Sequence, residues 1–444
     1  MRKAADSDLQ APSPWVVGLG TVGLFGFASF AFLGIAGANL SIALMLVAVA
    51  FDWRRFWRSL QGDPIVPLLA WATFAVALSA GLRASQFPEE WADQLRGLLE
   101  VVQLFFFLLV GWWLQGRQRL IFWVLTLALA SVTVAIWRAL DAHSLAELLA
   151  LQRPHFLWSI NAVGQYAASC LLGMALLTPR YWRWLADAPW RWPGRLAWLA
   201  GMGLVGALVV LSLSRGVWLS LLIVAGGLVL YTGWTHRHDR AAGRRLMLTA
   251  LLGMTLLLGA LSFSATIRER VEAIVQPVVQ LWVLEGDVRG MSEESGRIRA
   301  QLLVLGMRSW LEAPWLGHGP RAPQKIIRDH REQFAAWQRY TDFHSLPVDF
   351  LASFGVLGSL PLLITFLLVL RVAQRGYAEG RLDRDLYLTL VSLLALGALA
   401  QMTDTRVLDS HGRFYSMLLA GAAYSWWLVL RPDTGGAARP SASR

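Results

Sequence analysis

The stretch SATIRERVEAIVQPVV, residues 264–279, opens a polar block that ends at His344, within the sequence QRYTDFHSLPVDFLASFGVLG of residues 338–358. The chain on both sides of this block is strongly apolar. Hydrophobic residues make up 56% of the 444 residues and charged residues 16%, whereas an ordinary soluble domain has about 25% charged residues. The composition therefore predicts a membrane protein that keeps one polar segment, residues 264–344, outside the bilayer.

The apolar parts of the chain contain many segments that approach the roughly 20 mainly apolar residues needed to cross a bilayer. We expect an all-α, polytopic membrane fold with about 12 transmembrane helices and one large helical outer loop. The expected spans are residues 15–36, 39–52, 64–82, 97–115, 120–139, 159–178, 196–213, 216–234, 246–263, 346–370, 385–403 and 412–430. This pattern predicts helices 1–9 over residues 1–263, the loop over 264–344, helices 10–12 over 345–431, and a disordered cytoplasmic tail over 432–444.

The distribution of basic residues predicts how these helices are oriented. If the N-terminus is cytoplasmic, 22 of the 40 Lys and Arg residues fall in segments that face the cytoplasm, and 11 lie in the polar block. Short cytoplasmic loops of membrane proteins are enriched in Lys and Arg. We therefore expect both termini in the cytoplasm and residues 264–344 in the periplasm of a bacterial inner membrane. Orientation and contact with anionic membrane lipid account for the net charge of +11, so nucleic acid is not an expected partner.

The polar block has a helical pattern of its own. Ile298, Leu302, Leu305 and Trp310 recur near helical spacing and predict a helix over residues 296–312. The sequence APWLGHGP, residues 313–320, predicts a turn that ends this helix. Residues 323–340 predict a second, more polar helix. The block is expected to form a small helical cap on the outer membrane face.

Two positions are candidate anion sites. Arg215 lies in LSLSRGVW, residues 211–218, between two apolar segments that almost no loop separates. A guanidinium at this boundary can bind phosphate oxygens in bidentate fashion, or it can anchor the helix end by reaching to the interface. Arg297 and Arg299 begin the predicted outer helix, where a helix N-terminus also favours an anion. The alternative for them is a solvated helix paired with Glu293 and Glu294.

His344 is the candidate acid–base residue, because it stands where the polar block re-enters the membrane. An imidazole there can take a proton from a hydroxyl near neutral pH, and Asp342 or Asp349 could orient it. A structural interfacial histidine is the alternative. His318 competes for the role, but the glycines and prolines around it indicate a turn. The single cysteine, Cys170, excludes an intrachain disulfide, and no motif predicts a metal site.

The order of these motifs resembles the O-antigen ligase family and its polymerase relatives. The motifs are Ser214-Arg215-Gly216, then Ser295-Gly296-Arg297, then Ala313-Pro314-Trp315-Leu316-Gly317-x-Gly319, then His344-Ser345-x-x-x-Asp349, and finally Gly355-x-x-Gly358. The resemblance covers roughly residues 200–360, and the remaining helices agree only in number and hydropathy. Many family members have Asn after the histidine, where this chain has Ser345.

The resemblance implies a GT-C-like glycosyltransferase without a cofactor. It would move O-antigen polysaccharide from undecaprenyl pyrophosphate to a sugar hydroxyl of the lipid A core, at the periplasmic face of the inner membrane. Loss of the pyrophosphate builds negative charge, which fixed cations stabilise. With no metal motif, the expected course is metal-independent displacement with inversion. The catalytic residues implied are Arg215, Arg297 and His344, where His344 activates or positions the acceptor hydroxyl. The pyrophosphate ligands implied are Arg215, Arg297, Arg299, Arg321 and Lys325.

Other functions share part of this pattern. An O-antigen polymerase or a protein O-oligosaccharyltransferase of the same superfamily would use a similar framework. A membrane transporter would instead place charges near the middle of its spans and use interrupted helices. Arg138 is the one basic residue near the interior of a predicted span, and it lies close to the end of that span. The sequence therefore favours a transferase over a transporter.

Overall fold

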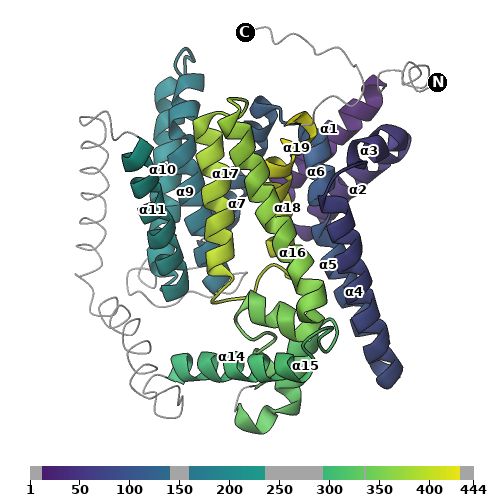
Figure 1. Cartoon of the computed structure of the whole chain (residues 1–444). Helices are drawn as coiled ribbons and strands as arrows, with labels where there is room; N and C mark the ends of the chain where they lie inside the picture. Colours follow the sequence, from purple (N-terminus) through teal and green to yellow (C-terminus); the bar gives the residue numbers. More distant parts are fainter. Residues whose placement is uncertain (1–12, 141–159, 236–293, 335–336, 431–444) are drawn as a thin grey trace, which may run out of the picture.

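The computed structural model describes residues 13–140, 160–235, 294–334 and 337–430 (Figure 1). Every regular element in these ranges is a helix, which confirms the predicted all-α class for the described chain. The α-helices are α1 (Pro14–Phe30), α2 (Ile35–Phe51), α3 (Trp53–Leu60), α4 (Ile65–Gln86), α5 (Trp91–Leu104), α6 (Phe107–Leu114), α7 (Gln118–Leu140), α9 (Ile160–Trp184), α10 (Arg191–Leu211), α11 (Arg215–Thr235), α14 (Glu294–Glu312), α15 (Ala322–Asp329), α16 (Leu346–Ala378), α17 (Arg384–Ala400), α18 (Ser410–Tyr424) and α19 (Trp427–Leu430). Short 3-10 turns are η1 (Pro88–Glu90), η3 (Arg331–Gln333) and η4 (Trp337–Arg339).

The described chain contains seven helical segments that are long and apolar enough to cross a membrane. An eighth is added if α2 and α3, which are bent by 93°, form one span. α1 has 17 residues, or roughly 25 Å of helix against a bilayer core of roughly 30 Å. The predicted span 246–263 lies outside the described residues. The chain is thus a multi-helix membrane protein, whereas twelve spans and the GT-C-like arrangement stay predictions.

Two predicted helices have different boundaries in the structure. The span expected at residues 97–115 is α5 and α6, which are separated by a turn at residues 105–106. The second outer helix, expected over 323–340, is wrong in length, because α15 ends at Asp329. Phe334 then adopts an extended backbone, with φ −130° and ψ 102°, and its ring is buried beside Ile327 and Phe343. Burial of this ring requires the chain to leave the helical path.

The first outer helix agrees with its prediction, since α14 covers residues 296–312. Figure 1 shows α14 lying across the lower end of the helix bundle. Leu302 and Leu305 are buried in a small apolar core that also contains Phe343 and Val348, from the segment entering α16. Gly306 permits this crossing, because a Cβ there would lie 2.5 Å from Val348 Cγ1. The outer loop therefore packs against the start of α16 through its own core.

α16 is broken at Gly355, and the turn after α14 packs into the break. Gly355 has φ 59° and ψ −167°, so the continuous-looking helix consists of two parts. Its neighbours Val356 and Leu357 donate backbone hydrogen bonds to the carbonyls of Pro314 and Trp315, at 2.9 and 3.0 Å. These bonds satisfy donors that the broken helix leaves without partners. The Gly-containing motifs around residues 313–319 and 355–358 thus have a structural role.

We expect Gly355→Ala to lower the free energy of unfolding by about 2 kcal/mol or more. The left-handed φ disfavours a side chain, and the added Cβ would lie 2.2 Å from the carbonyl carbon of Trp315. The matched control is Gly226→Ala on α11, where a Cβ meets nothing within 4 Å. The unfolding temperatures of both variants are measured by tryptophan fluorescence during thermal unfolding in detergent. Equal unfolding temperatures for the two variants would contradict the proposed packing.

Candidate functional site

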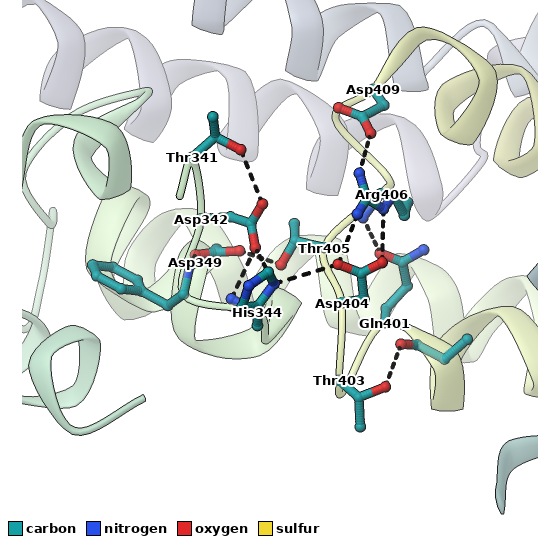
Figure 2. A network of polar contacts seen from close by, with 12 residues as sticks. Thr341, Asp342, His344, Asp349, Gln401, Thr403, Asp404, Thr405, Arg406 and Asp409 are labelled. Carbon is teal, nitrogen blue, oxygen red and sulfur yellow. Dashed lines mark hydrogen bonds and ion pairs between the residues drawn. The ribbon is translucent and has the colours of Figure 1, made fainter. Parts of the chain in front are cut away.

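Two segments far apart in the sequence meet in a network of polar contacts (Figure 2). One is the segment that enters α16, and the other is the loop of residues 401–409 between α17 and α18. The backbone N–H of Leu346 donates to the carbonyl of Gln401 at 2.8 Å. The Gln401 side chain in turn accepts hydrogen bonds from the backbone N–H groups of Arg406 and Val407, at 2.6 and 3.2 Å. Gln401 therefore shapes the loop and joins it to α16.

His344 lies between two carboxylates. Its Nδ1 is 3.1 Å from Asp342 Oδ1 and 3.4 Å from Asp404 Oδ1 (Figure 2). The geometry is that of an ion pair, because Nδ1 lacks a well-aligned hydrogen bond. The backbone of His344 is held as well, since its N–H donates to Asp342 Oδ1 at 2.9 Å. His344 has a left-handed backbone conformation, with φ 56°. Of the two acids predicted to orient His344, Asp342 does contact it.

Asp349, the other predicted orienting acid, has a different task. Its Oδ1 accepts a hydrogen bond from the backbone N–H of Phe343 at 2.8 Å, and its Oδ2 accepts one from the Thr405 hydroxyl. The side chain is 2% exposed. Asp349 therefore ties the segment before α16 to the loop 401–409. The residues that it binds, Phe343 and Thr405, are the direct neighbours in sequence of His344 and Asp404.

Asp404 is the central carboxylate of the site. Arg406 donates two hydrogen bonds to it, from Nε at 2.8 Å and from Nη2 at 2.9 Å, and contacts Asp409 at 3.1 Å. Burial alone would raise the pKa of Asp404, but the contact with the His344 ring and the charge of Arg406 hold that pKa below its usual range. Asp404 is therefore ionised at neutral pH and faces His344 as an anion.

His344 is consequently a cation in this arrangement. Burial by itself would lower its pKa, but the close contacts with the carboxylates of Asp342 and Asp404 and their charges outweigh burial and raise the pKa from 6.5 to about 9. At neutral pH the ring thus carries a proton on both nitrogens. It can donate to an anionic oxygen as it stands, and it accepts a proton only after losing one.

The predicted anion residue Arg215 is the first residue of α11. α11 approaches the loop 401–409 closely, since a Cβ on Gly216 would lie 2.2 Å from Thr403 Oγ1. The Ser212–Ser214 turn before it is fixed by Trp218, whose indole N–H donates to the Val209 carbonyl at 2.7 Å. The packing therefore places the Ser-Arg-Gly motif beside the loop that carries Asp404.

A narrow cavity of about 10 Å³ lies between these elements, with room for roughly one water molecule. Arg299 of α14 reaches it together with residues of α9, α11 and the loop 401–409. The lining residues are Asn161, Gln165, Ser214, Gly216, Val217, Arg299, Ala400, Thr403 and Asp404. Ser214 and Gly216 of the Ser-Arg-Gly motif, Arg299 of α14 and the carboxylate that contacts His344 thus meet at one place.

The other predicted pyrophosphate ligands have different positions. Arg297 lies on α14, and its buried Nε has no hydrogen-bond partner among the described residues. Arg321 and Lys325 face a separate cleft, where Arg321 is paired with Glu100 and Lys325 with Glu90. That cleft shares no lining residue with the narrow cavity.

His318, the competitor of His344, is used for packing. Its Nε2 contacts the carbonyl of Ser309 at 2.7 Å, and its backbone N–H donates to the Ala352 carbonyl at 2.8 Å. Both contacts help to join the turn after α14 to α16. The ranking of His344 above His318 therefore agrees with the geometry.

Asp342, His344 and Asp404 also form a group that could hold a metal ion, with one ligand atom from each within 4.8 Å of the others. The sequence motifs did not predict this group, because Asp404 lies 60 residues after His344. A divalent cation there would compete with the proton of His344 and would face Arg406, which already donates twice to Asp404. The donor set thus suits a protonated imidazole better than a divalent cation.

Asp404 and Arg406 were missed in the sequence. The sequence did contain an indication of these two residues. The short loop QMTDTRVLD, residues 401–409, has three charged residues between two apolar helices. Buried charges near a membrane are costly without a partner or a task. This concentration of charge pointed to a site.

Comparison with protein families finds one assignment. Residues 200–363 match the family model described as O-Antigen ligase. The matched range contains Arg215, Arg297, Arg299 and His344, whereas Asp404 lies beyond it. Comparison with curated proteins finds no match.

The raised pKa of His344 predicts a pH dependence of stability. The folded pKa of about 9 exceeds the ordinary value of 6.5, so the protonated ring stabilises the fold fully below pH 6.5. This contribution, on the order of 3 kcal/mol, should disappear as the pH rises through about 9. Unfolding followed by tryptophan fluorescence from pH 6.5 to pH 9 should show this loss, and His344→Gln should lack it. Parallel pH profiles of the two proteins would exclude the ion-paired imidazolium.

Proposed function

We propose that this chain belongs to the O-antigen ligase family, whose family model matches residues 200–363, and that it is a ligase that transfers polysaccharide to lipid A-core. The family consists of membrane glycosyltransferases of the ligase and polymerase type, and the apolar helices of the described chain agree with a membrane enzyme. The proposed donor is O-antigen polysaccharide on undecaprenyl pyrophosphate, and the proposed acceptor is a sugar hydroxyl of the core.

One observation carries this proposal: the separate motifs meet beside a single carboxylate. Asp404 contacts His344 and also lines the narrow cavity with Arg299, Ser214 and Gly216. The site lies at the end of the bundle where α14 crosses it (Figure 1), and the proposal takes this end to be a membrane boundary. Both proposed substrates have lipid tails in the membrane and sugars outside it, and a boundary site suits both parts of each substrate.

The proposed reaction is a direct displacement at the anomeric carbon of the donor. The acceptor oxygen forms a bond to this carbon while the bond from carbon to the pyrophosphate oxygen breaks, and the configuration inverts. The leaving pyrophosphate keeps the electron pair, and fixed cations stabilise it. Arg215, Arg297 and Arg299 are the proposed cations, since all three belong to elements at the outer end of the bundle.

We assign the acceptor side of the reaction to the cluster around His344. One imidazolium between Asp342 and Asp404 leaves the three groups with a net charge of −1, so the cluster can accept the hydroxyl proton. His344 then positions the acceptor, and a neighbouring carboxylate receives the proton. This mechanism uses no metal. Inhibition of the purified enzyme by a chelator, reversed by a divalent ion, would contradict that part of it.

His344→Ala should leave the protein in the membrane and lower transfer by about 100-fold or more. The measurement is the formation of capped lipopolysaccharide in a deletion strain that carries the variant. His330→Ala is the matched control, because His330 is an exposed histidine of the same outer segment. The ligase assignment also requires that the deletion strain accumulate polymer on its lipid carrier. Single-unit caps in that strain would indicate an O-antigen polymerase instead.

Arg215→Lys should lower transfer by about 100-fold, because it keeps the charge but loses the planar fork that binds two phosphate oxygens. Arg138→Lys is the control, since Arg138 is an exposed residue at the end of α7. Both variants are purified and assayed with the same donor and acceptor. A wild-type rate for Arg215→Lys would show that Arg215 only anchors α11.

A further inference from the structure

A second cleft lies apart from the narrow cavity, between η1 with the neighbouring ends of α4 and α5 and the outer helix α15. Its volume is about 360 Å³, within the range of roughly 300–1,000 Å³ typical of ligand sites. The lining residues are Arg83, Phe87, Glu89, Glu90, Asp93, Gln94, His318, Arg321, Ala322, Gln324, Lys325, Ile326, Arg328 and Asp329. Nothing in the proposed transfer step uses this cleft.

The charges that line the cleft are balanced, with four cationic and four anionic side chains. The central ones are paired: Arg83 Nε lies 3.0 Å from Glu90 Oε2, and Lys325 also contacts Glu90. Arg321 is paired with Glu100, a residue just outside the lining. A phosphate would therefore have to compete with carboxylates for every central cation. The cleft suits a neutral ligand with many hydrogen-bonding groups better than a pyrophosphate.

The walls of the cleft are fixed by packing. The Arg83 guanidinium carbon and the Lys325 ammonium nitrogen lie 3.9 and 3.8 Å from the centre of the Phe87 ring. Such cation–π contacts, together with the shared carboxylate of Glu90, hold both long side chains in one arrangement. The polar groups of the cleft are therefore held in place before a ligand arrives.

Gln94 supplies an unused hydrogen-bond acceptor in this cleft. The residue is 4% exposed, and its Oε1 is buried with no hydrogen-bond partner among the described residues. Buried polar atoms normally have a partner, so an unpaired one in a ligand-sized cleft points to a missing donor. An amide oxygen accepts only from N–H or O–H groups. A sugar hydroxyl provides such a donor, whereas an ionised phosphate does not.

Charged residues connect the cleft to the His344 site. Arg413 of α18 is 8% exposed and interacts electrostatically with Glu100 near the cleft and with Asp409 near the site. Asp409 is in turn 3.1 Å from Arg406, the partner of Asp404. A chain of charged side chains thus links the cleft to the proposed transfer site.

We propose that this cleft is a saccharide-binding subsite that holds sugar residues of one of the two glycan-bearing substrates. The inference rests on the proposed function. It adds a site that binds the glycan at a distance from the glycosidic bond that reacts. It assigns Gln94 and Gln324 as hydrogen-bonding groups and the paired acids as acceptors for further hydroxyls. Arg321 and Lys325 then act as parts of the sugar site.

The test measures glycan binding without transfer. Two delipidated probes from the same strain are used: the core oligosaccharide and the O-polysaccharide. Each is titrated by calorimetry against the full-length protein in nanodiscs. One of the two should bind the wild type, which identifies the substrate concerned. Gln94→Met should bind that glycan roughly three- to tenfold more weakly, because it removes one acceptor. Gln103→Met, on the same helix and outside the cleft, should bind it as the wild type does.

A second variant covers the case in which Gln94→Met does not fold. Gln324 is exposed on α15, so Gln324→Ala should fold normally and weaken binding of the same glycan. The subsite is refuted if neither glycan binds the wild type, if the folded cleft variants bind as the wild type does, or if Gln103→Met weakens binding equally. Transfer by His344→Ala at the wild-type rate would refute the proposed function alone, since binding is measured separately.

Discussion

Asp404 accepts both hydrogen bonds of the Arg406 fork, and its Oδ1 lies 3.4 Å from the His344 ring. A buried carboxylate of this kind needs its partners, because removing one partner of a buried ion pair costs about 3–5 kcal/mol. The loop 401–409 is therefore held in one conformation. Through Thr403 it contacts Gly216 of α11, and through Thr405 it contacts Asp349 of α16. The positions of four helix ends depend on this one loop.

Much of the remaining outer architecture depends on glycine. Gly216, Gly306 and Gly355 each lie where a Cβ would come within 2.5 Å of a neighbouring atom. The resulting close approach joins α11 to the loop, α14 to α16, and the turn after α14 to the break in α16. The glycines in the sequence motifs are thus partly explained by close packing of the helices and not only by a role in the reaction. The charged residues between them are the ones to which we assign the proposed chemistry.

Features that depend on local periodicity could be predicted from the sequence. Contacts between segments far apart in the chain could not. The helix over residues 296–312 followed from apolar spacing, and His344 followed from its place at the membrane boundary. The resemblance implied that Arg321 and Lys325 bind pyrophosphate, and the sequence did not reveal their acidic partners, which lie 221 and 235 residues away. Asp404 was missed for the same reason. The end of α15 was mispredicted because burial of the Phe334 ring, a tertiary effect, overrides local helix propensity.

For the transfer reaction that we propose, the narrow cavity has a consequence for the competition between sugar and water. A donor activated for attack by a sugar hydroxyl is also open to attack by water, which is far more abundant. A site with room for roughly one water molecule before its substrates bind limits that hydrolysis. Opening the cavity then has to be driven by binding of the donor and acceptor themselves. The yield of intact product per donor consumed would thus be set by how tightly α11, α14 and the loop 401–409 close.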